Sequence, residues 1–102
     1  MKLVIAIIRP ALLPDVKEVL FDEKVEGFSV TDVMGCGNQW GHTESEKNTT
    51  VESNLIRKIK IEFQVAGTRV RPVIDKIMRV CRSGRIGDGK IFVLNVSNSV
   101  AM

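Results

Sequence analysis

The alternation of apolar and polar positions divides this chain into four strand-like runs and two helix-like runs. Residues 3–8 form a continuous apolar run rich in β-branched side chains, which is typical of a strand covered on both faces. Residues 28–34 and 58–65 alternate between apolar and polar positions and predict half-buried strands. Residues 91–96 are again mostly apolar and predict a fourth strand.

The two segments between these strands have helical spacing. After Pro14, the apolar residues Val16, Val19 and Leu20 recur on one side, and we expect Gly27 to close this first helix. The second helix should follow Thr68, which is a predicted N-cap residue. Its apolar positions recur at i, i+3, i+4, i+7, i+8 and i+11, and they are Val70, Val73, Ile74, Ile77, Met78 and Cys81.

The resulting order is strand, helix, strand, strand, helix, strand. It predicts one α+β, ferredoxin-like domain over residues 1–102, with an antiparallel four-stranded sheet and both helices on one face. A long loop at about residues 37–55 should protrude from this domain. The first strand is apolar on both sides and the fourth nearly so, which favours self-association through the face without helices.

Composition excludes several classes of function. The net charge is only +3 and the chain has no tyrosine for stacking on bases, so nucleic-acid binding is disfavoured. Cys36 and Cys81 stand in unrelated contexts beside a single histidine, so we expect packing cysteines and no structural zinc. With no secretion signal and no apolar segment of membrane-spanning length, we expect a cytoplasmic protein that is not inserted in a membrane.

Glycines and charges gather between the second helix and the last strand, at residues 83–90. Backbone N–H groups of Gly84, Gly87 and Gly89 can surround an anion, and Lys90 adds a charge that suits phosphate. The alternative is an ordinary helix-to-strand turn in which Gly84 caps the helix. The segment is not a P-loop, because a P-loop follows a strand and opens a helix.

The segment from residue 38 to residue 57 has no apolar periodicity and is dense in polar residues. Such a loop in a small domain is usually functional or disordered. Trp40 favours a partner surface, since a large aromatic residue in a polar loop suits an interface. A weak metal site of His42, Glu44 and Glu46 is conceivable, but we expect His42 to be an ordinary solvated loop residue and predict no metal.

Several motifs together resemble one family. They are Ile5-x-Ile7-Ile8-Arg9-Pro10, Val16-Lys17, Thr31-x-Val33-x-Gly35-x-Gly37-x-Gln39-x-Gly41-His42-Thr43-Glu44, Lys58-x-Lys60-x-Glu62 and Arg82-Ser83-Gly84-x-Ile86-Gly87-Asp88-Gly89-Lys90-Ile91-Phe92-Val93. Residues 1–100 are similar to the PII signal-transduction family on these motifs, and the last motif is the most specific.

The resemblance implies a compact homotrimer that binds ATP or ADP in three clefts between subunits. Phosphates would lie against Gly87, Asp88, Gly89 and Lys90. The adenine and ribose would meet Ile7, Gly35, Glu62 and Gln64 of one subunit, and Phe28 and Ser29 of its neighbour. The base of the long loop completes the implied nucleotide site with Cys36, Gly37, Asn38 and Gln39.

The same resemblance implies a second ligand and a protein partner. In the family, 2-oxoglutarate binds through Mg²⁺ and ATP together with residues at the positions of Gln39 and Lys58. The long loop would dock onto an enzyme, a regulator or a membrane transporter, here through Trp40, His42, Thr43 and Glu44. The implied function is nitrogen signalling or related metabolite sensing.

The chain departs from the family at three positions. Val51 stands where the loop often carries a tyrosine that is uridylylated, Asn38 where a loop arginine meets the last phosphate, and Ala101 where a neighbour's arginine reaches the phosphates. A second such arginine would fall just beyond Met102. We therefore expect ADP, and also AMP, to bind at least as well as ATP, and 2-oxoglutarate to add little.

Two other functions remain as alternatives. One is a divergent adaptor of the same family that senses a metal ion or bicarbonate for a membrane transporter. The other is a small enzyme, which is disfavoured because the chain has one histidine, in the loop, and no acid dyad at catalytic spacing. We predict that the protein is not an enzyme.

Overall fold

The four strand-like runs pair into one antiparallel sheet in the computed structural model, which describes residues 1–36, 55–84 and 88–102. The elements of the described residues are β1 (Lys2–Ile8), η1 (Pro10–Leu12), α1 (Leu13–Asp22), β2 (Phe28–Gly35), β3 (Ile56–Val65), η4 (Gly67–Arg69), α2 (Val70–Cys81) and β4 (Gly89–Asn95). This order confirms the predicted α+β, ferredoxin-like fold.

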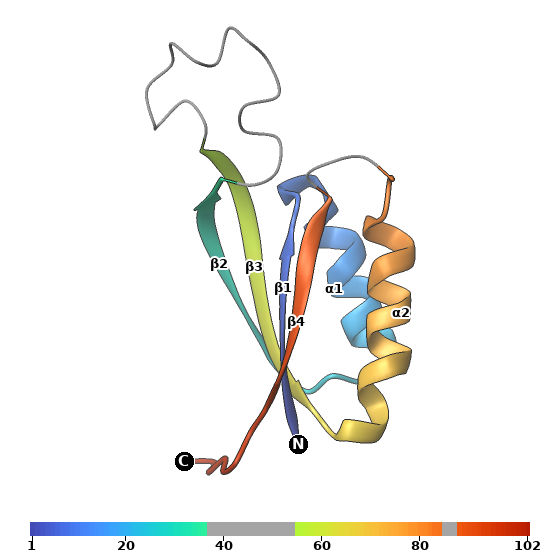
Figure 1. The fold of residues 1–102 in the computed structure, drawn as a ribbon. Coiled ribbons are helices and arrows are strands. Elements are labelled where there is room, and N and C mark those ends of the chain that lie inside the picture. Colours follow the sequence, from blue (N-terminus) through green and yellow to red (C-terminus); the bar gives the residue numbers. More distant parts are fainter. Residues whose placement is uncertain (37–54, 85–87) are drawn as a thin grey trace, which may run out of the picture.

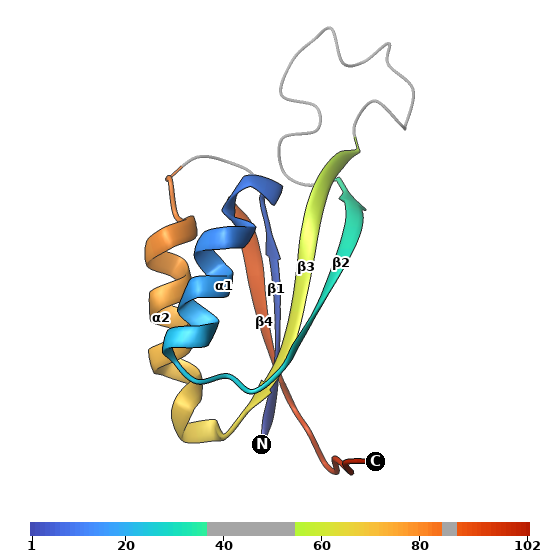
Figure 2. The same ribbon diagram turned by 180° about the vertical axis from the view of Figure 1, so that it is seen from behind.

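The sheet has the strand order β2-β3-β1-β4, so β1 and β3 are central and β2 and β4 are the edges. Both helices cover the same face of the sheet, and the two opposite views agree on this (Figures 1 and 2). We call the face that carries no helix among the described residues the open face. No helix in the described ranges is long and apolar enough to span a membrane.

The core lies between the helices and the covered face of the sheet. Val4, Ala6 and Ile8 of β1 point to this side and are buried, which follows from the two-residue period of a strand. They pack in one cluster with buried residues of β3 and both helices, among them Ile61, Phe63, Val16, Leu20, Val73 and Ile77. The helical spacing of the sequence therefore identified the core faces, except that Met78, expected on the apolar face of the second helix, is 37% exposed.

The other side of β1 is apolar as well and faces away from the helices. Leu3 lies directly opposite Leu94 of β4, and Ile5 lies directly opposite Phe92. Directly opposite residues of an antiparallel pair share a face, so these four side chains form an apolar stripe on the open face. Phe92 and Leu94 are 46% and 45% exposed, respectively, in the single chain.

The end of α1 corrects one prediction. The helix ends at Asp22 rather than near Gly27, and Lys24 adopts a positive φ of 58°. The N–H groups of Lys24 and Val25 donate to the carbonyl oxygens of Phe21 and Leu20 at 3.0 and 2.9 Å, the pattern of a Schellman cap. Val25 is buried, and its packing holds Lys24 in a conformation that usually favours glycine.

Other boundaries also differ from the sequence expectation. Thr68 is not an N-cap, because it lies inside the short helix η4, and Arg69 precedes α2 without a capping side-chain hydrogen bond. The strand β4 begins at Gly89, two positions before the expected start. This earlier start brings Lys90 into the sheet, directly opposite Ile7 of β1.

Candidate functional site

The glycine-rich segment leaves the end of α2 and returns at the start of β4. Gly84 has a φ of +82° and Gly89 a φ of +129°, conformations that favour glycine. A Cβ built on Gly89 would lie 2.0 Å from the carbonyl oxygen of Ile7, so the approach to β1 leaves no room for a side chain. The backbone therefore requires glycine at position 89, and the positive φ favours it at position 84.

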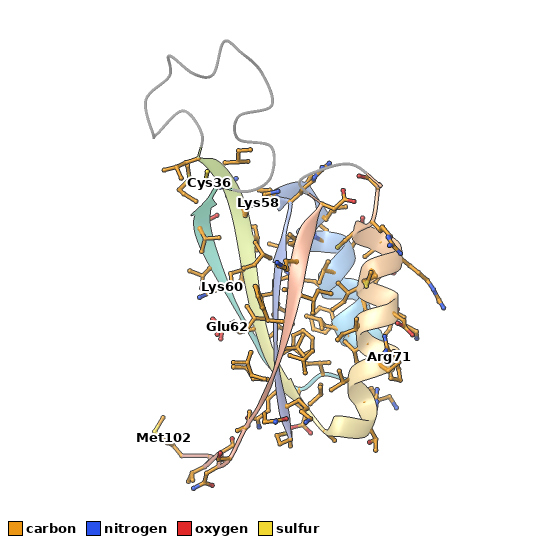
Figure 3. The ribbon with its side chains drawn as sticks, in the orientation of Figure 1. Cys36, Lys58, Lys60, Glu62, Arg71 and Met102 are labelled. Atoms are coloured by element: carbon orange, nitrogen blue, oxygen red, sulfur yellow. The ribbon has the colours of Figure 1, made fainter. Side chains whose placement is uncertain are left out.

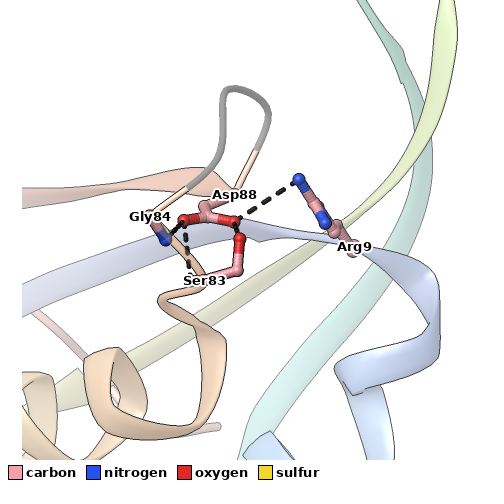
Figure 4. Close-up of polar contacts among 4 residues, drawn as sticks. All are labelled: Arg9, Ser83, Gly84 and Asp88. Carbon is pink, nitrogen blue, oxygen red and sulfur yellow. Dashed lines mark hydrogen bonds and ion pairs between the residues drawn. The ribbon is translucent and has the colours of Figure 1, made fainter.

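Asp88 closes this segment on itself (Figure 4). Its Oδ2 accepts the backbone N–H of Ser83 at 2.8 Å and that of Gly84 at 3.0 Å. Its Oδ1 accepts the Ser83 hydroxyl and lies 3.4 Å from a guanidinium nitrogen of Arg9. The hydrogen bonds from Ser83 are the main reason why the pKa of Asp88 lies below its ordinary value, and Arg9 contributes in the same direction.

Polar side chains follow β3 on the open face, and we call Lys58, Lys60, Glu62 and Gln64 the polar row; Figure 3 labels the first three. Lys60 of β3 and Lys90 of β4 lie on either side of Ile7, directly opposite it in register. Glu62 forms an ion pair with Lys60 at 3.5 Å and lies directly opposite Ser29 of β2. The sheet thus brings most of the nucleotide residues expected in the strands to one face, where Gln64 follows Glu62 on β3.

Lys58 lies at the end of this row, where β3 approaches Arg9. The residue is only 9% exposed, and burial lowers the pKa of its ammonium group, with Arg9 as the second cause. The Asp88 carboxylate acts in the opposite direction. Gly35 is its neighbour on β2, since a Cβ there would lie 3.6 Å from Lys58 Cγ. This corner of the sheet therefore concentrates positive charge around one carboxylate.

Two other predicted site residues lie apart from the row. Phe28 belongs to the covered face, where it packs against the core and its ring meets that of Phe21 edge to face at 6.0 Å. Cys36 follows β2 and is exposed, so the expectation of a packing cysteine is wrong for it. Cys81 is partly buried against the core, as expected.

A groove of about 400 Å³ runs between α2 and β4 on the covered side. Ile77 and Cys81 line it from the helix, and Val93 lines it from the strand. It reaches the glycine segment at Asp88, Gly89 and Lys90, but the polar row with Glu62 lies on the other face of the sheet. The groove and the predicted nucleotide residues therefore share only the glycine segment and Ile7.

Some predicted residues lie outside the described ranges. They are Gly37, Asn38, Gln39, Trp40, His42, Thr43, Glu44 and Gly87. Their roles stay predictions. Within the part of the chain that the structure describes, no three histidine, cysteine or acidic side chains gather as a metal site.

Sequence reasoning missed three residues of the site. In the sequence, Arg9 and Lys60 stand out only as members of family motifs, and Ser83 only as part of the glycine segment and its motif. For Ser83, a signal was present in the sequence, because a serine and an aspartate stand near the two ends of the glycine segment and both side chains commonly bond to nearby backbone. The contact of Arg9 with Asp88 joins segments far apart in sequence, and no local pattern predicts it.

Comparison with known proteins agrees with this geometry. The family described as "Nitrogen regulatory protein P-II" matches residues 1–102, the whole chain. The chain is 41% identical over 100 residues to the proteins called "Nitrogen regulatory protein P-II" in Rhizobium etli and Klebsiella oxytoca and "Nitrogen regulatory protein P-II 1" in Escherichia coli strain K12. Each alignment covers 98% of this chain and 89% of the relative. The chain belongs to the P-II family of nitrogen regulatory proteins.

Proposed function

We propose that this P-II protein is a signal-transduction regulator that binds adenine nucleotide between subunits and controls a partner protein through residues 37–55. The observation that carries the proposal is the position of the glycine segment. It meets the sheet where Lys90 and the polar row of β3 share one face with the apolar stripe. Lys90 suits phosphate groups, the polar row suits a base and a ribose, and the apolar stripe suits a neighbouring subunit.

The glycine segment suits phosphate for two reasons. The N–H group of Gly84 already donates to Asp88, so the expectation that it binds the anion is wrong, and the proposed donors are the N–H groups of Gly87 and Gly89. Lys90 adds a positive charge in the adjoining strand. The negative charge of Asp88 is already engaged by Ser83, Gly84 and Arg9, so it repels an incoming phosphate less than an unpaired carboxylate would. ADP, ATP and AMP are the proposed ligands, and we expect ADP and AMP to bind at least as well as ATP.

The open face supports assembly into a homotrimer. An apolar stripe on β1 and β4 is exposed in one chain, and burial against other copies would remove it from water. The nucleotide cleft would then lie between subunits, which gives Ser29 of a neighbour its proposed contact with the ligand, whereas the Phe28 side chain packs on the covered face. The partner loop would extend from the end of each sheet at which β2 ends and β3 begins.

The corner around Lys58 supports a second anion. Burial, and after it the Arg9 charge, lowers the pKa of the Lys58 ammonium group, so an added carboxylate would relieve repulsion between these two cations. We therefore keep 2-oxoglutarate as a proposed second ligand, with Gln39 and Lys58 as its residues and Mg²⁺ accompanying the nucleotide phosphates, and expect it to change nucleotide affinity little. Neither the described residues nor the comparisons support the alternative adaptor for a metal ion or bicarbonate. The relatives are named as regulatory proteins, which favours a regulator over an enzyme.

Calorimetric titration of the purified protein tests the nucleotide proposal. We expect ADP to bind with one site per subunit and to compete with ATP for the same site. A titration without binding of ADP, ATP or AMP at millimolar concentration would overturn it. Removing residues 40–52 should leave this binding intact, since the described nucleotide residues lie outside that segment, and should abolish regulation of the partner.

A further inference from the structure

The structure assigns the Asp88 side chain a positioning role. We propose that its carboxylate holds Ser83 and Gly84 close to the start of β4, which positions the two ends of the glycine segment for phosphate, and that it contacts neither the phosphate, the ribose nor an accompanying metal ion. This inference rests on the proposed nucleotide function and concerns how that site is built. The two parts of residue 88 would then have different roles. Its backbone would contact the phosphate, and its side chain would bind Ser83 and Gly84.

The hydrogen-bonding capacity of the carboxylate carries the argument. A carboxylate offers about four acceptor positions. Oδ2 accepts two backbone N–H groups, at 2.8 Å from Ser83 and 3.0 Å from Gly84. Oδ1 accepts the Ser83 hydroxyl and faces Arg9 at 3.4 Å. With these four partners in place, a metal ion or a ribose hydroxyl would have to displace one of them.

The same contacts hold the two described ends of the segment together. Ser83 and Gly84 follow the last turn of α2, and Asp88 precedes the first paired residue of β4. Bonds across five and four positions of sequence therefore tie the end of the helix to the start of the strand. Arg9 connects Asp88 to the end of β1, so these ends are held against the sheet as well. Because these ends are positioned before a ligand binds, less conformational entropy is lost on binding, which favours affinity.

Two substitutions separate this role from direct ligation. Asp88→Asn keeps one carbonyl oxygen, which can still accept the N–H groups of Ser83 and Gly84, but it removes the negative charge that makes a carboxylate a strong ligand of Mg²⁺. Asp88→Ala removes both functions. Asp75→Ala is the matched control, because Asp75 is an exposed carboxylate on α2 that makes only a 3.8 Å pair with Arg71. All four proteins are compared by ADP titration, in EDTA and in Mg²⁺.

We expect Asp88→Ala to weaken ADP binding by about tenfold, through lost pre-organisation, equally in EDTA and in Mg²⁺. Asp88→Asn should stay within about threefold of wild type, because the two backbone hydrogen bonds remain. Asp75→Ala should bind as wild type does. A loss that occurs only in Mg²⁺ and is as large for Asp88→Asn as for Asp88→Ala would overturn the proposal, because it would make the carboxylate a metal ligand.

A second measurement needs no nucleotide and separates failure of this inference from failure of the proposed function. Amide hydrogen exchange of Ser83 and Gly84 in the protein without ligand should be slow in wild type and Asp88→Asn, and fast in Asp88→Ala. Equal exchange rates in all three proteins would reject the positioning role. If wild type binds no ADP while its exchange is slow, the nucleotide function falls and the structural role of Asp88 stands.

Discussion

The ammonium nitrogen of Lys90 lies 5.8 Å from the centre of the Phe92 ring, on the open face of β4. This distance places the cation within reach of the ring's π face. Lys90 belongs to the proposed phosphate site, whereas Phe92 belongs to the apolar stripe that we expect another subunit to cover. Nucleotide binding and assembly therefore meet at two side chains of one strand.

Replacing Lys90 by alanine should weaken ADP binding at least about tenfold, which corresponds to about 1.4 kcal/mol. The reason is that Lys90 supplies the charge nearest to the glycine segment in β4. Calorimetric titration measures the change, with Lys17→Ala on the exposed side of α1 as the control. Equal affinity of Lys90→Ala and wild type would remove Lys90 from the site.

Wild-type protein should scatter light as a trimer at micromolar concentration, because one chain leaves Phe92 and Leu94 nearly half exposed. A charged residue on the stripe, as in Phe92→Asp, should shift the mass toward the monomer, since an unpaired buried charge is costly. Circular dichroism establishes that the variant is folded. A wild-type mass equal to that of one chain would contradict both the trimer and a cleft between subunits.

ADP should bind at least as tightly as ATP, and 2-oxoglutarate should change the affinity little even with Mg²⁺. Asn38, outside the described residues, and Ala101 stand at positions where the family resemblance implies arginines for the phosphates. Each missing charge-assisted hydrogen bond removes about 1.5–3 kcal/mol. Competition among ATP, ADP and AMP measures the preference. A clear preference for ATP that 2-oxoglutarate strengthens would mean that other residues replace these arginines.

Alkaline pH should destabilise the fold through Cys81. Burial, together with Asp15 and Asp88, raises the pKa of the Cys81 thiol from 9.0 to about 11. Between these values the unfolded chain releases the thiol proton and the folded chain keeps it, so the free energy of unfolding falls as pH rises. Cys81→Ser should make this decline shallower in urea titrations between pH 9 and pH 11. An identical slope in both proteins would show that Cys81 does not contribute.

The Glu23 side chain should stabilise the contact between the helices. It is 12% exposed and pairs with Lys76 at 3.3 Å and Arg69 at 3.6 Å, while Arg69 also donates to the Glu23 carbonyl oxygen at 2.7 Å. Glu23→Ala should lower the free energy of unfolding by about 1–2 kcal/mol, because two cations lose a shielded partner. Asp75→Ala, which breaks an exposed pair on α2, should cost less than about 0.5 kcal/mol in the same urea titration. Equal effects would show that shielding is unimportant here.

The sequence predicted the strands and core faces well because each depends on local periodicity. Val4, Ala6 and Ile8 had to share a face, and Val73 and Ile77 had to share another. The end of α1 was mistaken because Gly27 looked like a terminator, whereas the burial of Val25 allows Lys24 to take that conformation. The prediction that Thr68 is an N-cap was wrong, because the local sequence does not distinguish a capping threonine from one inside a short 3-10 helix.

The candidate site was predictable to a different extent. The motif alone predicts Gly89 and Lys90 as site residues. The register of β4 then explains why Lys90 lies opposite Ile7 and why Gly89 approaches its backbone. The contact between Arg9 and Asp88 depends on how β1 and α2 pack, which no spacing within either segment encodes. The exposure of Cys36 follows from its position just beyond the end of β2.

The tight approach of Gly89 to Ile7 limits how this site can be altered by mutation. Any side chain at position 89 would collide with the backbone of β1, so variants at this position should fail to fold for a reason unrelated to nucleotide. A screen that measures only ligand binding would score these misfolded variants as non-binders and suggest a ligand contact at Gly89. Lys90 is the next residue along β4 and is exposed on the open face, so a substitution there avoids this collision and tests the proposed ligand contact separately from the fold.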